Sequence, residues 1–195
     1  LLAEIPSRPK PRSGPARRPP TRVGGLVLAA GRSTRMGEAN KLLERVDGVA
    51  LVARAVDALL ATRLDPVVVV VGHQAGEVRA ALRSRPVRFV DNPDRAGGLS
   101  SSLARGVASL EGDVEAAMVA LGDMPFVRSA HLEALLEAFA EHPAAGICVP
   151  VHRGRRGHPV LFSARYFEEM AAGEGDVGAR AILERHAAEV LEVEI

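Results

Sequence analysis

The sequence predicts an α/β fold, a three-layer sandwich in which helices cover a mostly parallel sheet. Three observations support this class. Short apolar segments alternate with segments whose apolar residues recur at helical spacing, as in chains built from strand–helix–strand units. The strand-like segments are rich in β-branched residues, with five consecutive valines at Val67–Val71. Aromatic residues make up only 3% of the 195-residue chain, so the core between the layers must be aliphatic.

The elements follow one another as right-handed crossovers require. A continuous apolar segment indicates a strand buried on both faces, and apolar residues at i, i+3, i+4 and i+7 indicate a helix with one buried face. Strands are expected at Gly25–Ala30, Val67–Val71, Val87–Val90, Ala116–Leu121, Ile147–Val151, Pro159–Phe162 and Val190–Ile195. Helices are expected around Val52–Leu60, 75–83, 99–110, Leu132–Phe139 and 178–187. The close spacing of the last strands predicts an antiparallel or mixed edge.

The first 22 residues differ from the rest of the chain, with six Lys/Arg, six of the 13 prolines and one acidic residue. Such a segment cannot bury an apolar face, so we expect a disordered tail followed by one domain over residues 23–195. The domain carries 19 basic and 23 acidic residues, which argues against nucleic-acid binding. No apolar segment is long enough to cross a bilayer, and no signal peptide is visible. With a single cysteine, Cys148, the cytoplasm is the simplest compartment.

The loop after the first strand is the most informative segment, because ligands of such sheets bind beyond the carboxyl ends of the strands. It contains the small residues Ala29–Gly31, which let a base or phosphate approach the backbone. Arg35 and Lys41 can neutralise charge on a leaving pyrophosphate. The loop matches neither the P-loop nor the dinucleotide pattern. An ordinary basic surface loop is the alternative, but it does not explain why strand, glycines and cations coincide.

Two more loops are expected at the same edge. Asp123 follows a hydrophobic strand in Gly122-Asp123-Met124-Pro125 and can hold Mg²⁺ near triphosphate oxygens. A turn or helix-cap aspartate is the alternative. In the segment from Asn92 to Ser102, two glycines and three serines begin a helix, whose first N–H groups favour an anion. A simple helix cap is the alternative there.

Two segments near the C-terminus carry further candidates. Gly154–Pro159 is a basic turn between strands, and it holds either an anionic acceptor or nothing more than solvent. Asp176 lies in a glycine-rich segment where a helix cap is the alternative. The six histidines show no metal-ligand spacing, so a structural zinc is not expected.

These motifs together resemble the molybdopterin-type nucleotidyltransferases, and more closely the molybdenum cofactor cytidylyltransferase family. The resemblance covers about residues 24–195. It rests on Leu28-Ala29-Ala30-Gly31-x-Ser33-x-Arg35-Met36-Gly37…Asn40-Lys41, on Asn92 with Gly97–Ser101, and on Gly122-Asp123-Met124-Pro125, Gly157-His158-Pro159 and Gly175-Asp176-x-Gly178-Ala179-Arg180. It implies a Rossmann-like fold of the nucleotide-diphospho-sugar transferase type. The implied reaction transfers CMP from CTP to the terminal phosphate of molybdopterin and releases pyrophosphate, with Mg²⁺ as cofactor.

The resemblance also implies roles for individual residues. Arg35, Lys41 and Asp123 are the implied catalytic residues, and Asp123 is also the metal ligand. The implied nucleotide contacts are Leu28, Ala29, Ala30, Gly31, Lys41, Gly72, Asn92, Gly97, Ser100 and Ser101. The implied acceptor contacts are Arg155, Arg156, His158 and Asp176.

The choice of cytosine as the base and of molybdopterin as the acceptor rests on differences between branches of the family. Guanylyltransferases of this family usually carry Leu-Ala-Gly-Gly in the first motif, so Ala30 favours cytosine. A guanylyltransferase, a sugar-1-phosphate nucleotidyltransferase and a non-catalytic molybdenum cofactor carrier stay open as alternatives. A molybdoenzyme that receives the cofactor is a further implied partner, whereas nucleic acid and membrane are not expected.

Overall fold

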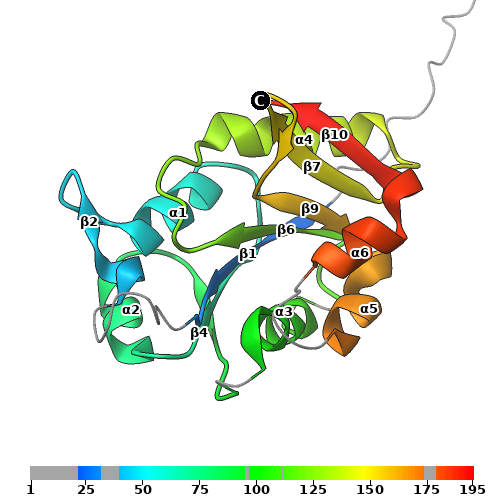
Figure 1. Cartoon of the computed structure of the whole chain (residues 1–195). Helices are drawn as coiled ribbons and strands as arrows, with labels where there is room; N and C mark the ends of the chain where they lie inside the picture. The colour runs from blue at the N-terminus through cyan, green and yellow to red at the C-terminus, as the bar shows by residue number, and fades with distance from the viewer. Residues whose placement is uncertain (1–21, 32–39, 95–96, 111, 174–178) are drawn as a thin grey trace, which may run out of the picture.

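The computed structural model of the protein describes residues 22–31, 40–94, 97–110, 112–173 and 179–195. An eight-stranded sheet forms its centre, with helices on both faces (Figure 1). The strands are β1 (Val23–Ala29), β4 (Val67–Val71), β5 (Arg88–Asp91), β6 (Ala116–Leu121), β7 (Ile147–His152), β8 (Arg155–Arg156), β9 (Val160–Ser163) and β10 (Val190–Glu194). The α-helices are α1 (Leu51–Leu60), α2 (Ala75–Ala81), α3 (Gly98–Ala108), α4 (Ser129–Glu141), α5 (Phe167–Ala172) and α6 (Arg180–Arg185). The predicted α/β class is confirmed.

Shorter elements join these. The 3₁₀ turns are η1 (Lys41–Leu43), η2 (Ala164–Tyr166) and η4 (Ala187–Glu189). A separate hairpin consists of β2 (Arg45–Val46) and β3 (Val49–Ala50). The tail predicted for residues 1–22 lies, except for Arg22, outside the described residues. No helix in the described ranges is long and apolar enough to span a membrane.

The direction of the strands determines which loops meet. The order in the sheet is β10-β7-β9-β6-β1-β4-β5, and β8 pairs with β7. Strands β6, β1, β4 and β5 are parallel to one another, whereas β9 is antiparallel to both β6 and β7. The predicted mixed edge is therefore confirmed. We call the side of the sheet where β1, β4, β5 and β6 end the carboxyl edge, and the opposite side, where they begin, the amino edge.

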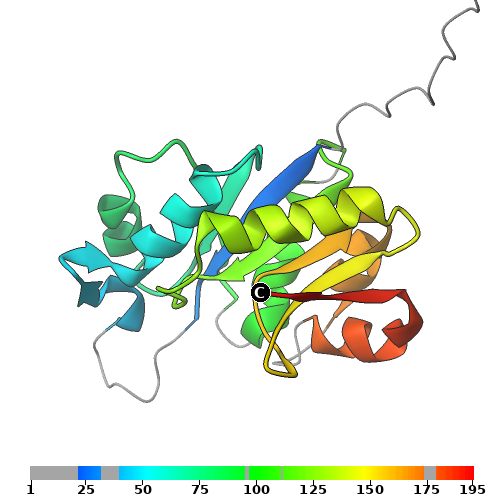
Figure 2. The same ribbon diagram turned by 90° about the horizontal axis from the view of Figure 1, so that it is seen from above.

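The core consists of two aliphatic layers, one on each face of the sheet. All seven residues of β1 and all five valines of β4 are buried, and successive residues point to opposite faces. Helices α1, α2 and α4 cover one face, and α3, α5 and α6 cover the other (Figures 1 and 2). Helix α3 lies very close to the sheet, because a Cβ added at Gly106 would meet the Leu26 side chain at 2.4 Å.

The observed elements differ from the predicted ones mainly in helix α5, which was not predicted, in the hairpin β2–β3 and in helix α6. The hairpin β2–β3 was not predicted, because its two-residue strands are too short to show a period. Its turn does carry the Asp47-Gly48 dipeptide, and both residues have positive φ, at 53° and 80°. The helix expected over 178–187 is shorter. In the described residues α6 covers Arg180–Arg185, and a 3₁₀ turn at Ala187–Glu189 then leads into β10.

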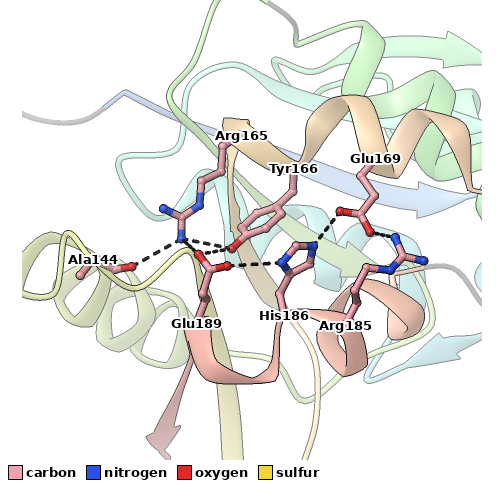
Figure 3. Close-up of polar contacts among 7 residues, drawn as sticks. All are labelled: Ala144, Arg165, Tyr166, Glu169, Arg185, His186 and Glu189. Carbon is pink, nitrogen blue, oxygen red and sulfur yellow. Dashed lines mark hydrogen bonds and ion pairs between the residues drawn. The ribbon is translucent and has the colours of Figure 1, made fainter.

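A polar network attaches the C-terminal segment to the body at the amino edge (Figure 3). The Tyr166 hydroxyl donates to Glu189 Oε2 over 3.0 Å and accepts from Arg165. The His186 ring lies between Glu189 and Glu169, with its Nε2 2.8 Å from Glu169 Oε2. Tyr166 is buried. The network therefore joins η2 and α5 to η4 and β10.

Candidate active site

Backbone pairing brings the predicted nucleotide loops together at the carboxyl edge. Ala29 at the end of β1 pairs with Val71 at the end of β4, which in turn pairs with Asp91 at the end of β5. On the other side of β1, the Gly122 N–H donates to the Leu28 carbonyl over 3.0 Å. The loops that follow β1, β4, β5 and β6 therefore start side by side.

Gly72 is the position where two of these loops touch most closely. A Cβ added to Gly72 would lie 2.9 Å from Ala30 Cβ and 3.0 Å from the Ala30 carbonyl oxygen. Contacts this short require a residue without a side chain. Gly31, one residue further along, is exposed, and a Cβ there would meet nothing within 4 Å. Among the described residues, nothing therefore occupies the space into which a side chain at position 31 would project.

Asn92 organises the loop that leads into α3. Its side chain is buried, and Nδ2 donates to Ser101 Oγ over 2.9 Å and to Ser102 Oγ over 3.0 Å. Its Oδ1 accepts from the N–H of Asp94, whose carboxylate accepts from the Gly97 N–H. Asn92, Gly97 and Ser101 are thus close together, and the side chains of Asn92 and Ser101 help to hold the loop in place.

A ligand at this loop would therefore contact backbone groups more than side chains. Ser100 is also buried. The first N–H groups of a helix have no acceptor within the helix, and those of α3 follow this fixed turn. These backbone N–H groups are suited to bind an anion.

Lys41 and Asp123 meet although 82 positions separate them in the sequence. Lys41 Nζ donates to Asp123 Oδ2 over 3.1 Å, and their side chains are 47% and 38% exposed. Asn40 caps η1, since its Oδ1 accepts from the Leu42 N–H over 3.1 Å. Asp123 is placed by Gly122, which approaches Leu42 so closely that a Cβ would be 3.2 Å from Leu42 Cδ2.

His158 lies beside this pair because β9 is antiparallel to β6. It precedes β9, so it lies at the same edge as Asp123, which follows β6. Burial lowers the pKa of His158, while the Val119 carbonyl and the charge of Asp123 oppose that shift. Its Nδ1 is buried and has no hydrogen-bond partner among the described residues. Burial thus favours the neutral form of the ring.

The basic turn after β7 is at this edge too, but its two arginines differ. Arg156 Nε donates to Glu192 Oε1 over 2.7 Å, which ties β8 to β10. Arg155 is exposed, and it has no ion-pair partner among the described residues. Of the predicted acceptor contacts, Arg155 and His158 therefore offer unused groups.

Two predicted site residues, Arg35 and Asp176, lie outside the described residues. One residue that sequence reasoning missed is Arg54 of α1. Its guanidinium donates to the Pro125 carbonyl over 3.3 Å and to the Val46 carbonyl over 3.0 Å. It thereby holds the loop after Asp123 against the hairpin β2–β3. No local signal marks this role, because the acceptor carbonyls depend on the fold.

The residues present suit a magnesium ion that is shared with a substrate. In the described ranges, no three His, Cys, Asp or Glu side chains gather as a metal site. Asp123 offers a partly exposed carboxylate. Mg²⁺ often takes one or two carboxylates and completes its shell with phosphate oxygens and water. A site of this kind suits a metal that binds a nucleotide triphosphate at the same time.

The fold and the arrangement of this edge define a nucleotidyltransferase. Residues 25–190 match the family model of the MobA-like NTP transferase domain, and the chain belongs to this family. The predicted enzyme class is thereby confirmed, at the level of the family.

The relatives with curated names carry different names. The chain is 35% identical over 180 residues to the bifunctional protein GlmU of Anaeromyxobacter dehalogenans, a match that covers 83% of the chain and 36% of GlmU. The chain thus spans about a third of the length of that relative. It is also 32% identical over 169 residues to nicotine blue oxidoreductase of Paenarthrobacter nicotinovorans, with 83% of the chain and 81% of the relative covered.

Solved structures agree on the fold. A nucleotidyl transferase from Methanothermobacter thermautotroptrophicus is 29% identical, with a TM-score of 0.74 over 89% of this chain and 87% of that one. Rv0371c from Mycobacterium tuberculosis H37Rv is 28% identical, with a TM-score of 0.76 over 91% and 90%. A further structure of Rv0371c is a complex with manganese.

Proposed function

We propose that the protein transfers CMP from CTP to the terminal phosphate of a molybdopterin-type acceptor and releases pyrophosphate. One observation carries this proposal. The nucleotide loops after β1, β4 and β5, the Lys41–Asp123 pair, and His158 with the basic turn lie in this order along one edge of the sheet. Nucleotide and acceptor would therefore bind on opposite sides of Asp123.

The reaction asks mainly for positioning and charge stabilisation. An oxygen of the acceptor phosphate attacks the α-phosphorus of CTP. The new P–O bond forms as the bond from the α-phosphorus to the bridging oxygen breaks, and pyrophosphate leaves with that electron pair. Lys41 would neutralise charge on the β- and γ-phosphates, and the backbone at 28–31 would hold the nucleotide. Mg²⁺ bound at Asp123 would supply further charge neutralisation on the phosphate oxygens.

The proposed choice of cytosine and of a pterin acceptor rests on the motifs. Ala30 is the position at which guanylyltransferases of the resembling family usually carry glycine. In the structure Ala30 lies so close to Gly72 that a Cβ at position 72 would meet it at 2.9 Å. On the acceptor side, Arg155 offers charge and His158 a neutral ring nitrogen, and we propose that both contact the pterin phosphate side. Asp176 would act with them.

Two other functions are favoured by particular relatives. The match to GlmU supports a sugar-1-phosphate acceptor with the same chemistry. The match to nicotine blue oxidoreductase covers most of both chains and supports an oxidation–reduction reaction on the same fold.

A nucleotide panel tests the proposal. Pyrophosphate release is measured with Mg²⁺ and CTP, GTP, UTP or dTTP, with molybdopterin or a sugar 1-phosphate as acceptor. We expect release from CTP with molybdopterin only. Preferential use of GTP would overturn the choice of base, and turnover with the sugar phosphate would overturn the acceptor. An oxidation–reduction reaction without pyrophosphate release would show that the protein is not a nucleotidyltransferase.

A matched pair of variants tests the role of Asp123. Asp123→Asn should lower kcat about a hundredfold or more while Tm changes little, since the carboxylate is exposed and its loss removes charge stabilisation in the transition state. Asp113→Asn is the control, because Asp113 is a similarly exposed carboxylate that pairs with Arg88 over 3.2 Å at the amino edge. Full activity of Asp123→Asn would contradict the assignment.

A further inference from the structure

We propose that Lys41 is the resident counter-ion of Asp123 and that it makes metal and nucleotide binding interdependent. In this view the site takes a divalent metal together with the triphosphate and holds little metal alone. The inference rests on the proposed function, since it assumes that Asp123 is the metal ligand and that Lys41 contacts phosphates.

The first step is the ion pair itself. Lys41 Nζ lies 3.1 Å from Asp123 Oδ2, where a bound metal would otherwise neutralise the carboxylate. Both side chains are partly exposed, and exposed ion pairs contribute little to stability and separate readily. Lys41 can therefore leave Asp123 when a better partner is offered.

The second step is that the two backbones are held rigidly relative to each other. Asn40 caps η1, and Leu42 of that turn is buried. Leu42 Cδ2 lies against Gly122, whose N–H is bonded to the Leu28 carbonyl. Lys41 and Asp123 thus project from fixed positions, and only their side chains need to move for partners to be exchanged.

The third step concerns metal alone. A divalent ion at Asp123 without nucleotide would lie within a few ångströms of the Lys41 ammonium. Among the described residues, no cluster of acidic side chains is present to offset that repulsion. Free metal should therefore bind weakly.

The fourth step concerns the metal–triphosphate complex. Phosphate oxygens give Lys41 a new anionic partner, and the metal becomes the new partner of Asp123. After the exchange of partners, both the Lys41 ammonium and the Asp123 carboxylate still have an opposite charge beside them, so neither charge is left uncompensated. Because coupling between two ligands is reciprocal, nucleotide should tighten metal binding as much as metal tightens nucleotide binding.

Water-proton relaxation with Mn²⁺ tests this without turnover, because no acceptor is present. Mn²⁺ is mixed with the protein, with CTP, or with both. For the wild-type protein we expect almost no relaxation enhancement with protein alone, and an enhancement well above that of Mn²⁺–CTP when all three are mixed. Lys41→Met should bind Mn²⁺ about five- to tenfold more tightly than wild type in the absence of CTP, since an adjacent positive charge is gone.

Two variants show whether the effect is local. The double variant Lys41→Met/Asp123→Asn should lose the gained Mn²⁺ binding. Arg88→Met frees an equally exposed carboxylate, Asp113, at the amino edge and should leave Mn²⁺ binding unchanged. Circular dichroism melts confirm that each variant is folded.

The outcomes separate the inference from the proposed function. If wild-type protein binds Mn²⁺ equally well with and without CTP, or if Lys41→Met binds no more Mn²⁺ than wild type, the inference is wrong while a cytidylyltransferase stands. If CTP gives no ternary enhancement and no pyrophosphate is released, the proposed function itself fails.

Discussion

Gly72 and Gly76 are four residues apart, and they differ in how much space the structure leaves for a side chain. A methyl group at position 72 would strike Ala30, whereas one at position 76 in α2 would meet nothing within 4 Å. Gly72→Ala should therefore destabilise the protein by about 1–3 kcal/mol and raise the KM for CTP. Gly76→Ala should be neutral or stabilising by up to about 1 kcal/mol, because alanine favours helix. Urea unfolding and initial rates measure both, and equal behaviour of the two variants would contradict the packing argument.

Cys148 of β7 is fully buried, and burial raises the pKa of its thiol to about 11. Native protein should therefore not react with a thiol reagent at pH 8. The sign of the pH effect follows: above the ordinary thiol pKa near 9, the unfolded chain loses this proton and the folded chain keeps it. Stability from this group is present below pH 9 and is lost toward pH 11.

Cys148→Ala isolates that contribution. Wild type should be more stable than the variant at pH 8, and the difference in unfolding free energy should shrink by about 2 kcal/mol as the pH rises to 11. Denaturant titrations across this range measure it. A difference independent of pH would show that the thiol is not protected by burial.

At the scale of elements, the network around Tyr166 holds β10 to the body. Tyr166→Phe removes the hydroxyl that donates to Glu189 and accepts from Arg165, so we expect a loss of about 1–2 kcal/mol. Hydrogen exchange should increase most in β10 and η4. Glu184→Gln is the control, since it breaks only the exposed Arg180–Glu184 pair within α6. A uniform increase across the whole sheet would contradict this local role.

The elements that sequence predicts well are those with one dominant physical cause. Strands β1, β4 and β6 are buried on both faces, which leaves a continuous apolar pattern, and Ala116–Leu121 has the predicted bounds. The two-residue strands of the hairpin leave no such pattern. The site behaves likewise: Lys41 and Asp123 could be expected at one edge because each follows a parallel strand. Arg54 could not, because its acceptor is the backbone carbonyl of Pro125, and no residue type or motif in the sequence marks that carbonyl as an acceptor.

At the scale of the whole molecule, the proposed ligands should affect one edge only. With CTP and Mg²⁺ present, hydrogen exchange should slow at the carboxyl edge, because bound phosphates and base shield backbone N–H groups there. The segments concerned are 72–74, 92–94, 97–102 and 122–124. Segments at the amino edge should exchange at unchanged rates, namely 64–66, 113–115 and 144–146. Slowing at both edges would indicate a global change in place of a local site.

The reversal of strand direction at β9 has a consequence for how such a protein can change its substrate. Everything proposed for the nucleotide comes from loops after β1, β4, β5 and β6, whereas Arg155 and His158 come from the single connection between β7 and β9. In the proposed function, the acceptor contacts other than Asp176 thus come from one short contiguous stretch at the periphery of the nucleotide half. Exchanging that stretch between relatives offers a route to new acceptors that keeps the nucleotide chemistry intact.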